Sequence, residues 1–275
     1  MITELWTKNN TMTLKTSMSH IMKYKHLLKW KNSESILEVG CGDGTNAKQV
    51  ILPILPKDYK EFHISDKEPN FVKYIERNVT IPKLKVFKQD VVEDEVPKEL
   101  ENRFDHIFGF FFLHMLMDPR KALVNIHKML KPGGQTFFNF FEYTPINKVM
   151  QNMAIHPKWG KYEHKENAYC CHENPLEAYT QDFITAGFKD AIYNTEKETW
   201  EFDEGPEWES KLYIILNKIL TLSQPIYNLK SLFPYSSTRS TSRNNFYFQH
   251  STYHRLFMIL SIVTWLVLLI ILMHL

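Results

Sequence analysis

Residues 36–45 read Ile-Leu-Glu-Val-Gly-Cys-Gly-Asp-Gly-Thr, a short apolar run that ends in three alternating glycines. An apolar run of this length, followed by glycines and by a helix-forming segment over residues 45–52, predicts a strand, a tight turn and a helix. Glycine at such a turn allows the backbone to approach a ligand that a Cβ atom would hold away. This turn is therefore the first candidate for a ligand-binding element.

The spacing of the glycines separates this turn from the dinucleotide-binding fingerprint. That fingerprint is G-x-G-x-x-G and places a pyrophosphate at the turn. Here Gly40, Gly42 and Gly44 have the spacing G-x-G-x-G, Glu38 lies two residues before them, and the turn contains no Lys or Arg. A zwitterionic amino acid joined to a nucleoside fits such a turn better than a pyrophosphate does. An ordinary strand-to-helix turn without a ligand is the alternative.

The pattern of apolar runs predicts an α/β fold in which strands alternate with helices. Besides residues 36–39, the predicted strands are residues 61–66, 84–89, 104–112, 135–141 and 188–202. The predicted helices are residues 11–31, 45–52, 71–79, 93–102, 119–130 and 176–186. The run over residues 104–112 is too apolar for a strand with one solvent face, which indicates a parallel sheet covered on both sides. We therefore expect a doubly wound, mostly parallel sheet.

Two aspartates lie at the ends of predicted strands. Asp66 falls roughly 20 residues after the glycines, where α/β nucleotide sites place a carboxylate on the ribose hydroxyls. Alternatively, Asp66 only caps the helix that has Pro69 in its first turn. Asp90 follows the next strand and is either a second ligand contact or the first residue of an ordinary loop.

The glycine stretch resembles motif I of the class I S-adenosylmethionine-dependent methyltransferases. Two further stretches resemble motifs of the same family, namely Phe104-Asp-His106 with Leu113-His114, and Leu130-Lys-Pro-Gly-Gly134. From Glu4 to about Phe202 the chain is similar to the juvenile hormone acid methyltransferase branch. The resemblance implies a Rossmann-like fold, S-adenosyl-L-methionine as cofactor, and a small lipophilic carboxylic acid of the farnesoic or juvenile hormone acid type as acceptor.

The resemblance also implies which residues form the site. The expected cofactor-binding residues are Glu38, Gly40, Cys41, Gly42, Gly44, Asp66, Lys67, Asp90, Val91 and Phe110. Among these, Asp90 would accept a hydrogen bond from the exocyclic amine of adenine. The aromatic side chains of residues 110–112 and of Tyr143 could face the sulfonium, although core packing is expected for two of the three phenylalanines.

His114 is the candidate catalytic residue, as a hydrogen-bond donor to the acceptor carboxylate. A histidine that is simply packed at the end of its strand is the alternative. The branch commonly has a Trp directly after this His and a Gln in the N-terminal segment, whereas this chain has Met115 and Thr13 there. Because a carboxylate is ionised at neutral pH, the reaction needs no general base, and a missing Ser-His-Asp arrangement is compatible with it.

Composition excludes several other kinds of site. The 275 residues carry a net charge of +2 and show no basic stripe with interleaved aromatics, so nucleic acid is not an expected partner. Three cysteines, two of them adjacent, do not form a disulfide framework. Adjacent Cys170 and Cys171 with His164 and His172 do not have the ligand spacing of a zinc site, so no metal is expected.

The C-terminal part of the chain differs in character from the rest. Residues 256–275 contain no charged side chain, and a predominantly apolar segment of twenty residues matches the thickness of a bilayer core. We expect a methyltransferase domain over residues 1–222, a polar linker over 223–255, and a single-pass tail anchor that holds the domain in the cytosol. Without that segment the protein would be cytoplasmic. The family's last antiparallel strand has only one short candidate, residues 245–249.

Three function classes stay open from the sequence. The first is an O-methyltransferase that acts on a small lipophilic acid. The second is a nicotinamide-dependent oxidoreductase, disfavoured by the glycine spacing and by the absence of a Tyr-x-x-x-Lys pair after the fourth strand. The third is a membrane-tethered, incomplete and non-catalytic copy of such a methyltransferase.

Overall fold

The computed structural model of the chain describes residues 6–7, 10–116, 118–142, 155 and 174–196. All elements given below belong to one compact unit, Met1–Tyr143 with Asn167–Thr195. None of the helices among these described residues has the length and apolar character that crossing a bilayer requires. The predicted linker, tail anchor and strand over residues 245–249 lie outside the described residues, as do Tyr143 and the cluster from His164 to His172.

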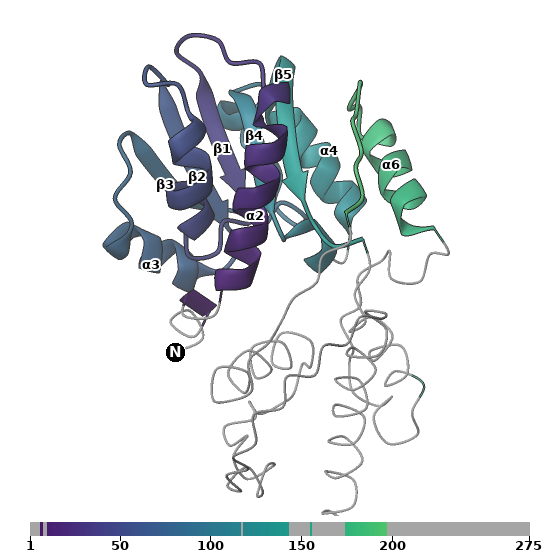
Figure 1. Cartoon of the computed structure of the whole chain (residues 1–275), viewed down its shortest axis with the longest axis horizontal. Coiled ribbons are helices and arrows are strands. Elements are labelled where there is room, and N and C mark those ends of the chain that lie inside the picture. The colour runs from purple at the N-terminus through teal and green to yellow at the C-terminus, as the bar shows by residue number, and fades with distance from the viewer. Residues whose placement is uncertain (1–5, 8–9, 117, 143–154, 156–173, 197–275) are drawn as a thin grey trace, which may run out of the picture. The chain divides into compact units, whose positions relative to one another are not determined.

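The centre of the described domain is a parallel sheet with the strand order β3-β2-β1-β4-β5 (Figure 1). Its strands are β1 (Ser35–Val39), β2 (Glu61–Asp66), β3 (Leu84–Lys88), β4 (Phe104–Phe110) and β5 (Leu130–Asn139). The strand order reverses between β1 and β4. Open α/β sheets bind ligands at such a reversal, outside the carboxyl ends of the strands. The glycine stretch follows β1 and therefore lies at this position.

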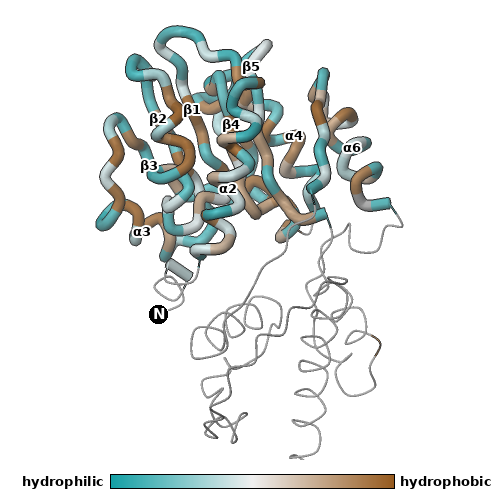
Figure 2. Tube along the Cα trace, in the orientation of Figure 1, coloured by the Kyte–Doolittle hydropathy of each residue, from teal (hydrophilic) through white to brown (hydrophobic). Residues whose placement is uncertain are grey.

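Both faces of the sheet are covered, as the sequence predicts. Alternate residues of a strand point to opposite faces. Leu37 and Ile107 accordingly belong to the apolar cluster that includes α4 and α6, whereas Ile36 and Phe108 belong to the cluster on the other face with α2. Figure 2 shows apolar residues along the strands between these layers. The predicted doubly wound arrangement is thus confirmed.

Four α-helices surround the sheet in the described residues. They are α2 (Thr11–Tyr24), α3 (Pro69–Asn78), α4 (Pro119–Met129) and α6 (Pro175–Thr185). The Asp118 side chain accepts from the Lys121 N–H and caps α4, as expected for Asp-Pro at a helix start. Gly187, with φ +103°, ends α6 where the sequence predicts its end.

Three helix predictions need correction. The helix over residues 11–31 ends at Tyr24 and continues only as a single 3₁₀ turn. The segment predicted as a helix over residues 45–52 contains a π-helical turn, Ala47–Ile51, and a 3₁₀ turn, because Pro53 has no N–H to continue a regular ladder. In the segment 93–102 the only helical turn is the 3₁₀ turn Lys98–Leu100, which starts after Pro97.

The strand predicted over residues 188–202 is wrong for its described part, because residues 188–196 contain no strand. The N–H of Phe188 donates to the Phe183 carbonyl, and the two rings pack with centroids 5.3 Å apart. This segment therefore folds back on α6 instead of pairing with the sheet. Strand β5 begins at Leu130 rather than at residue 135, with a register irregularity opposite Phe104 and His106 that accommodates the Lys-Pro-Gly-Gly turn.

Candidate active site

The three glycines after β1 all have left-handed backbone conformations, with φ of +64° at Gly40, +56° at Gly42 and +77° at Gly44. Side chains strongly disfavour this region, so the sequence of the turn follows from its shape. The turn is fixed to the neighbouring strand, because the N–H of Cys41 donates to the Ser65 carbonyl at 3.1 Å. We call residues 40–44 the glycine loop.

The missing side chains of the three glycines serve different purposes. A Cβ on Gly40 would lie 2.7 Å from the Phe112 Cβ, so this glycine makes room for a core phenylalanine. A Cβ on Gly44 would lie 3.3 Å from Ile75 in α3, so this one allows the helix to pack. At Gly42 the nearest atom is the Trp6 Nε1 at 3.4 Å. Gly42 is therefore the glycine whose open side is left for a ligand.

Asp66 holds the glycine loop in place. Its Oδ2 accepts from the Gly42 N–H at 2.8 Å, and its Oδ1 accepts from the Glu68 N–H at 2.9 Å in the turn that leads into α3. The second contact agrees with the helix-start interpretation, although the N-cap position itself is Glu68. Each carboxylate oxygen can accept more than one hydrogen bond. The role on the ribose hydroxyls is therefore compatible with the observed contacts and stays a prediction.

We predict that Asp66→Ala weakens cofactor binding by about 1–3 kcal/mol, because the Gly42 N–H loses its charged acceptor. Calorimetric titration with S-adenosylhomocysteine measures this loss. Asp58→Ala is a matched control, since Asp58 also accepts from a backbone N–H, that of Ser33, but on the exposed surface. Equal affinities for the two variants would show that Asp66 does not support the site.

Asp43, which the sequence analysis did not single out, joins the glycine loop to the N-terminal segment. It is buried, its Oδ1 accepts from the Thr45 N–H at 3.0 Å, and its Oδ2 accepts from the Asn10 side-chain amide at 2.9 Å. The first contact is a local turn typical of Asp two residues before a helix start, and could have been predicted. The second joins residues 33 positions apart and leaves no local signal.

Glu38 is the most unusual group of the site. It is only 1% exposed, and neither carboxylate oxygen accepts a well-formed hydrogen bond from the described residues, although the Ala47 N–H lies near it. Burial raises the pKa of Glu38 well above its ordinary value, the charges of Asp43 and Asp66 raise it further, and the Ala47 N–H opposes the shift. A buried carboxylate without a well-formed hydrogen bond is costly. Its position beside an open glycine fits the positively charged group of an amino-acid ligand.

Cys41 and Lys67 occupy contrasting positions at the same edge. Cys41 is buried, and burial raises the pKa of its thiol well above the usual range, so the thiol is neutral at pH 7. Lys67 is exposed, directly after Asp66.

In the described part of the chain, no group of three or more His, Cys, Asp or Glu side chains could hold a metal ion.

A backbone hydrogen bond joins the ends of β2 and β3, because the Gln89 N–H donates to the Asp66 carbonyl at 3.1 Å. Asp90 directly follows Gln89. The Oδ1 of Asp90 accepts from the Val92 N–H at 2.9 Å, which makes a local turn. Val91 is buried in the apolar core. The structure thus brings Asp90 to the same edge as Asp66, and the adenine contact stays a prediction.

The three phenylalanines after Gly109 are placed differently from one another. Phe110 is 4% exposed and packs between Phe108 and Phe137, and Phe112 packs on the glycines. Phe111 is half-buried and has φ +52°, a conformation that is rare for a bulky residue. Phe111 is thus the least buried of the three, and it packs against the outside of the core. From the sequence Phe110 is expected among the cofactor-binding residues and all three rings are candidates for the sulfonium, because the apolar run contains no sign of this turn.

His114 completes an aromatic cluster with Phe111 and Phe141 beyond the carboxyl end of β4. The His114 and Phe141 ring centroids are 4.8 Å apart, and the Phe111 and Phe141 centroids are 4.9 Å apart. Met115, which follows His114, is 47% exposed. Phe112 of the same segment lies against Gly40, so the segment that carries Phe111 and His114 passes the glycine loop. We call Phe111, His114 and Phe141 the aromatic wall.

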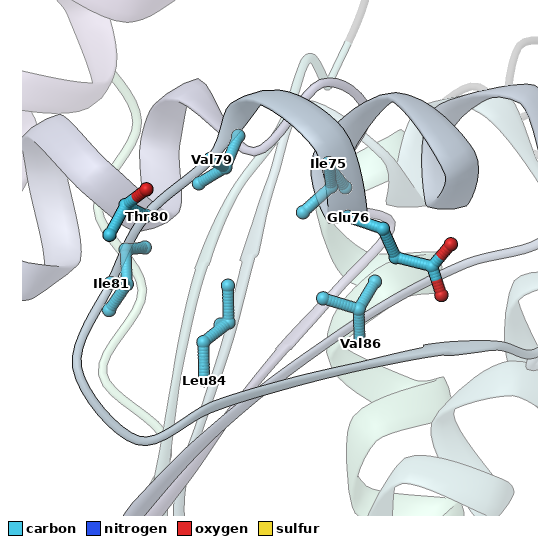
Figure 3. A pocket seen from close by; sticks show the side chains of 7 residues that line it. All are labelled: Ile75, Glu76, Val79, Thr80, Ile81, Leu84 and Val86. Atoms are coloured by element: carbon cyan, nitrogen blue, oxygen red, sulfur yellow. The ribbon is translucent and has the colours of Figure 1, made fainter.

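A cavity of about 380 Å³ lies elsewhere, between α3 and the edge strand β3 (Figure 3). Its lining residues are Ile75, Glu76, Val79, Thr80, Ile81, Leu84 and Val86. None of the predicted site residues lines it, and its single carboxylate, that of Glu76, points away from the apolar side chains. It is therefore not a candidate for the site of methyl transfer.

The known proteins that this chain resembles include several methyltransferases. Residues 37–136 match the family model of a methyltransferase domain. The chain is 25% identical to the juvenile hormone acid O-methyltransferase of Bombyx mori over 190 residues, which covers 67% of this chain and 68% of that relative. The Drosophila melanogaster protein of the same name is 26% identical over 144 residues, covering 51% and 48%.

A thiol S-methyltransferase of Rattus norvegicus is 29% identical over 139 residues, covering 49% of this chain and 54% of the relative. The chain thus spans about half the length of the fly and rat relatives that it matches. The matched region runs from the middle of β1 through most of β5 and includes the whole glycine loop. Taken with the parallel sheet and the acid-flanked glycine loop, the match identifies residues 37–136 as a methyltransferase domain of the S-adenosylmethionine-dependent class I type.

Proposed function

We propose that the protein O-methylates a small lipophilic carboxylic acid. The observation that carries the proposal is the aromatic wall, part of which belongs to the segment that passes the glycine loop. It offers an apolar surface and one histidine to an acceptor. The names of the moth and fly relatives support an acid acceptor. An isoprenoid acid of the farnesoic or juvenile hormone acid type is the finer form of this proposal.

The site residues suit S-adenosylmethionine in charge and in shape. Glu38 offers a buried carboxylate to the cationic amino group of the ligand. Gly42, which has no side chain, leaves space for the amino-acid part of the ligand. When bound, this cofactor supplies a methyl group activated by a positively charged sulfur. An aromatic ring at such a cation contributes about 0.5–2 kcal/mol, and Phe111 is the partly exposed aromatic residue of the three after Gly109.

The chain's own contribution is binding and orientation. A carboxylic acid is ionised at pH 7, so no side chain has to remove a proton from it. Holding the two reactants in line and excluding water can lower the barrier by about 7–11 kcal/mol. His114 would donate a hydrogen bond to one acceptor oxygen and leave the other for methylation.

Transfer of a labelled methyl group from the cofactor to a panel of acceptors tests the proposal. The panel contains isoprenoid acids, fatty acids, and the alcohols and thiols with the same carbon chains. We expect methyl esters from the acids alone. Products only from the thiols would contradict an acid acceptor and would agree instead with the activity named for the rat relative.

We predict that His114→Gln lowers kcat/KM for the acid by about 10-fold to 100-fold, the loss of a hydrogen bond to a charged group. Affinity for S-adenosylhomocysteine should not change, because the proposal assigns His114 to the acceptor and not to the cofactor. His26→Gln is the control, since His26 is an exposed histidine whose Nδ1 lies near the Lys23 carbonyl. Equal activity of His114→Gln and the wild type would assign His114 to packing alone.

We also propose that residues 256–275 anchor the protein in a membrane with the domain on the cytosolic side. The support is the absence of charge over these twenty residues and the basic residues Arg243, His254 and Arg255 before them. Resistance of the membrane-bound protein to alkaline extraction, together with protease accessibility of the domain, tests this placement. Release of the protein by alkali would contradict it.

A further inference from the structure

We propose that the outer face of α2 is a docking surface for an anionic lipid bilayer. This surface, the basic α2 face, consists of Lys15, Met18 and Met22 on the helix and of Lys25 and Lys29 directly after it. It is separate from the segment 256–275 and does not depend on which acceptor the enzyme methylates.

The charge of this region has one sign. Residues 10–33 contain Lys15, Lys23, Lys25, Lys29 and Lys31 and no Asp or Glu. Within the described residues, Lys15, Lys25 and Lys29 form no ion pair with a carboxylate. Each lysine near an anionic bilayer adds an attraction equivalent to roughly a fivefold change in binding. The face is thus complementary to anionic headgroups.

Apolar side chains stand among these lysines. Met18 and Met22 are 42% and 57% exposed, and they lie four residues apart on one face of the helix. Leu27 is also exposed, in the turn that follows. A helix with lysines around flexible apolar side chains is typical of segments that lie in the bilayer interface. A face that only needed solvation would not require the methionines.

The opposite face of α2 is fixed on the domain (Figure 1). Ser17 and Ile21 are buried, and Asn10, directly before the helix, donates to Asp43 of the glycine loop. After the helix, the Lys29 N–H donates to the Gln135 side chain at 2.6 Å. The domain therefore presents the basic α2 face in one fixed orientation.

This attachment favours a bilayer over other partners. A protein that encloses a basic helix in a groove needs apolar anchors around the helix, and here the inner residues are already used by the domain. Single-stranded nucleic acid would satisfy the lysines, but it prefers exposed aromatic rings to methionines. A lipid surface is flat, needs only one side of the helix, and accepts both the charges and the methionines.

The experiment uses the full chain with Cys170→Ser and Cys171→Ser and a fluorescent NBD label on Met22→Cys. Cys41 is buried and does not compete for the label. Vesicles of phosphatidylcholine, alone or mixed with phosphatidylserine, are added, with nitroxide lipids as quenchers. We expect a blue shift and quenching only with phosphatidylserine, both reversed by high salt. The same label on Lys98→Cys, an exposed lysine of another element, should not respond.

Charge variants test the lysines directly. A triple variant should lower the equilibrium constant for insertion of the label by on the order of 100-fold. It combines Lys15→Gln, Lys25→Gln and Lys29→Gln. A control triple variant removes the same charge from exposed lysines elsewhere and should leave this equilibrium constant unchanged. It combines Lys57→Gln, Lys60→Gln and Lys73→Gln. Both measurements report on the basic α2 face. Insertion of the C-terminal segment alone would therefore not produce the blue shift and quenching of the label on α2.

Several results would overturn the proposal. These are no response to phosphatidylserine, an equal response at Lys98→Cys, or a label that is already blue-shifted without vesicles because another part of the chain covers the face. A response to an acidic protein or to RNA in the absence of a response to vesicles would also overturn it. Failure here leaves the proposed methyl transfer untouched, since that is measured with soluble acceptors.

Discussion

Gly42→Val is expected to remove measurable cofactor binding, with a loss of affinity of at least about 100-fold. The backbone at Gly42 has φ +56°, and holding a β-branched residue there costs on the order of 1–3 kcal/mol. The valine side chain would also fill the side of the glycine loop where Trp6 is the neighbour among the described residues, which is the space assigned to the ligand. Calorimetry and fluorescence titration with S-adenosylhomocysteine measure the loss.

The control for this prediction is Gly133→Val. Gly133 has φ +76°, in the same left-handed region, but a Cβ there would meet no atom within 4 Å. This variant therefore carries a similar backbone strain at a distance from the glycine loop. Its melting temperature should fall as that of Gly42→Val does, while its cofactor affinity stays near the wild-type value. Similar affinities for the two variants would refute the placement of the ligand at Gly42.

The sequence predicts most of the central sheet because each signal there is local. β1 and β4 are mainly apolar runs, and β2 alternates Phe62 and Ile64 with polar residues. The structure places the boundaries of all three strands within two residues of those predicted. Asp118 before Pro119 is a complete capping signal in two residues, and its hydrogen bond is observed. A parallel sheet buried on both faces follows from the same apolar runs.

The parts of the site that the sequence does not reveal depend on contacts between distant segments. The three glycines look equivalent in the sequence, but Phe112 occupies the space at Gly40 and α3 occupies that at Gly44. The Asn10 amide reaches Asp43 only because α2 packs on the sheet. The conformation of Phe111 likewise depends on a bond from its N–H to the Asn139 carbonyl at the end of β5.

The segment 188–196 shows how tertiary packing overrides a local pattern. The sequence predicts a strand here, yet Phe188 and Tyr193 both pack against Phe183 of α6. Both rings are half-buried by this packing, which takes the place of pairing to β5. Strand propensity reflects the packing of side chains on a sheet surface, so a helix surface that accepts the same rings competes with it.

Glu38→Gln is expected to have two effects of opposite sign. It should stabilise the protein without cofactor by about 1 kcal/mol at neutral pH, because it removes a buried carboxylate that accepts no well-formed hydrogen bond from the described residues. It should weaken cofactor binding by about 10-fold to 100-fold, because the ligand's cationic group loses its charged acceptor. A residue with a purely structural role would not produce both changes.

The contribution of Glu38 to the stability of the folded protein should also depend on pH. Its pKa in the folded protein lies above the ordinary value near 4.5, so the folded state binds more protons than the unfolded state above that pH. The contribution of Glu38 to stability is therefore fully present below pH 4.5 and is lost as the pH rises through the raised pKa. The melting temperature of wild type relative to Glu38→Gln should fall over this range.

Cofactor binding should show the opposite trend, because a cationic ligand group favours the ionised form of Glu38. Affinity should rise with pH above 4.5 in the wild type and less so in Glu38→Gln, and binding should release a proton that calorimetry in buffers of different ionisation enthalpy detects. Glu34→Gln is the matched control. Glu34 is also buried with a raised pKa, but it lies 3.2 Å from His106 at the far end of the sheet. Proton release that is the same in Glu38→Gln as in Glu34→Gln would exclude Glu38 as the group that meets the ligand's charge.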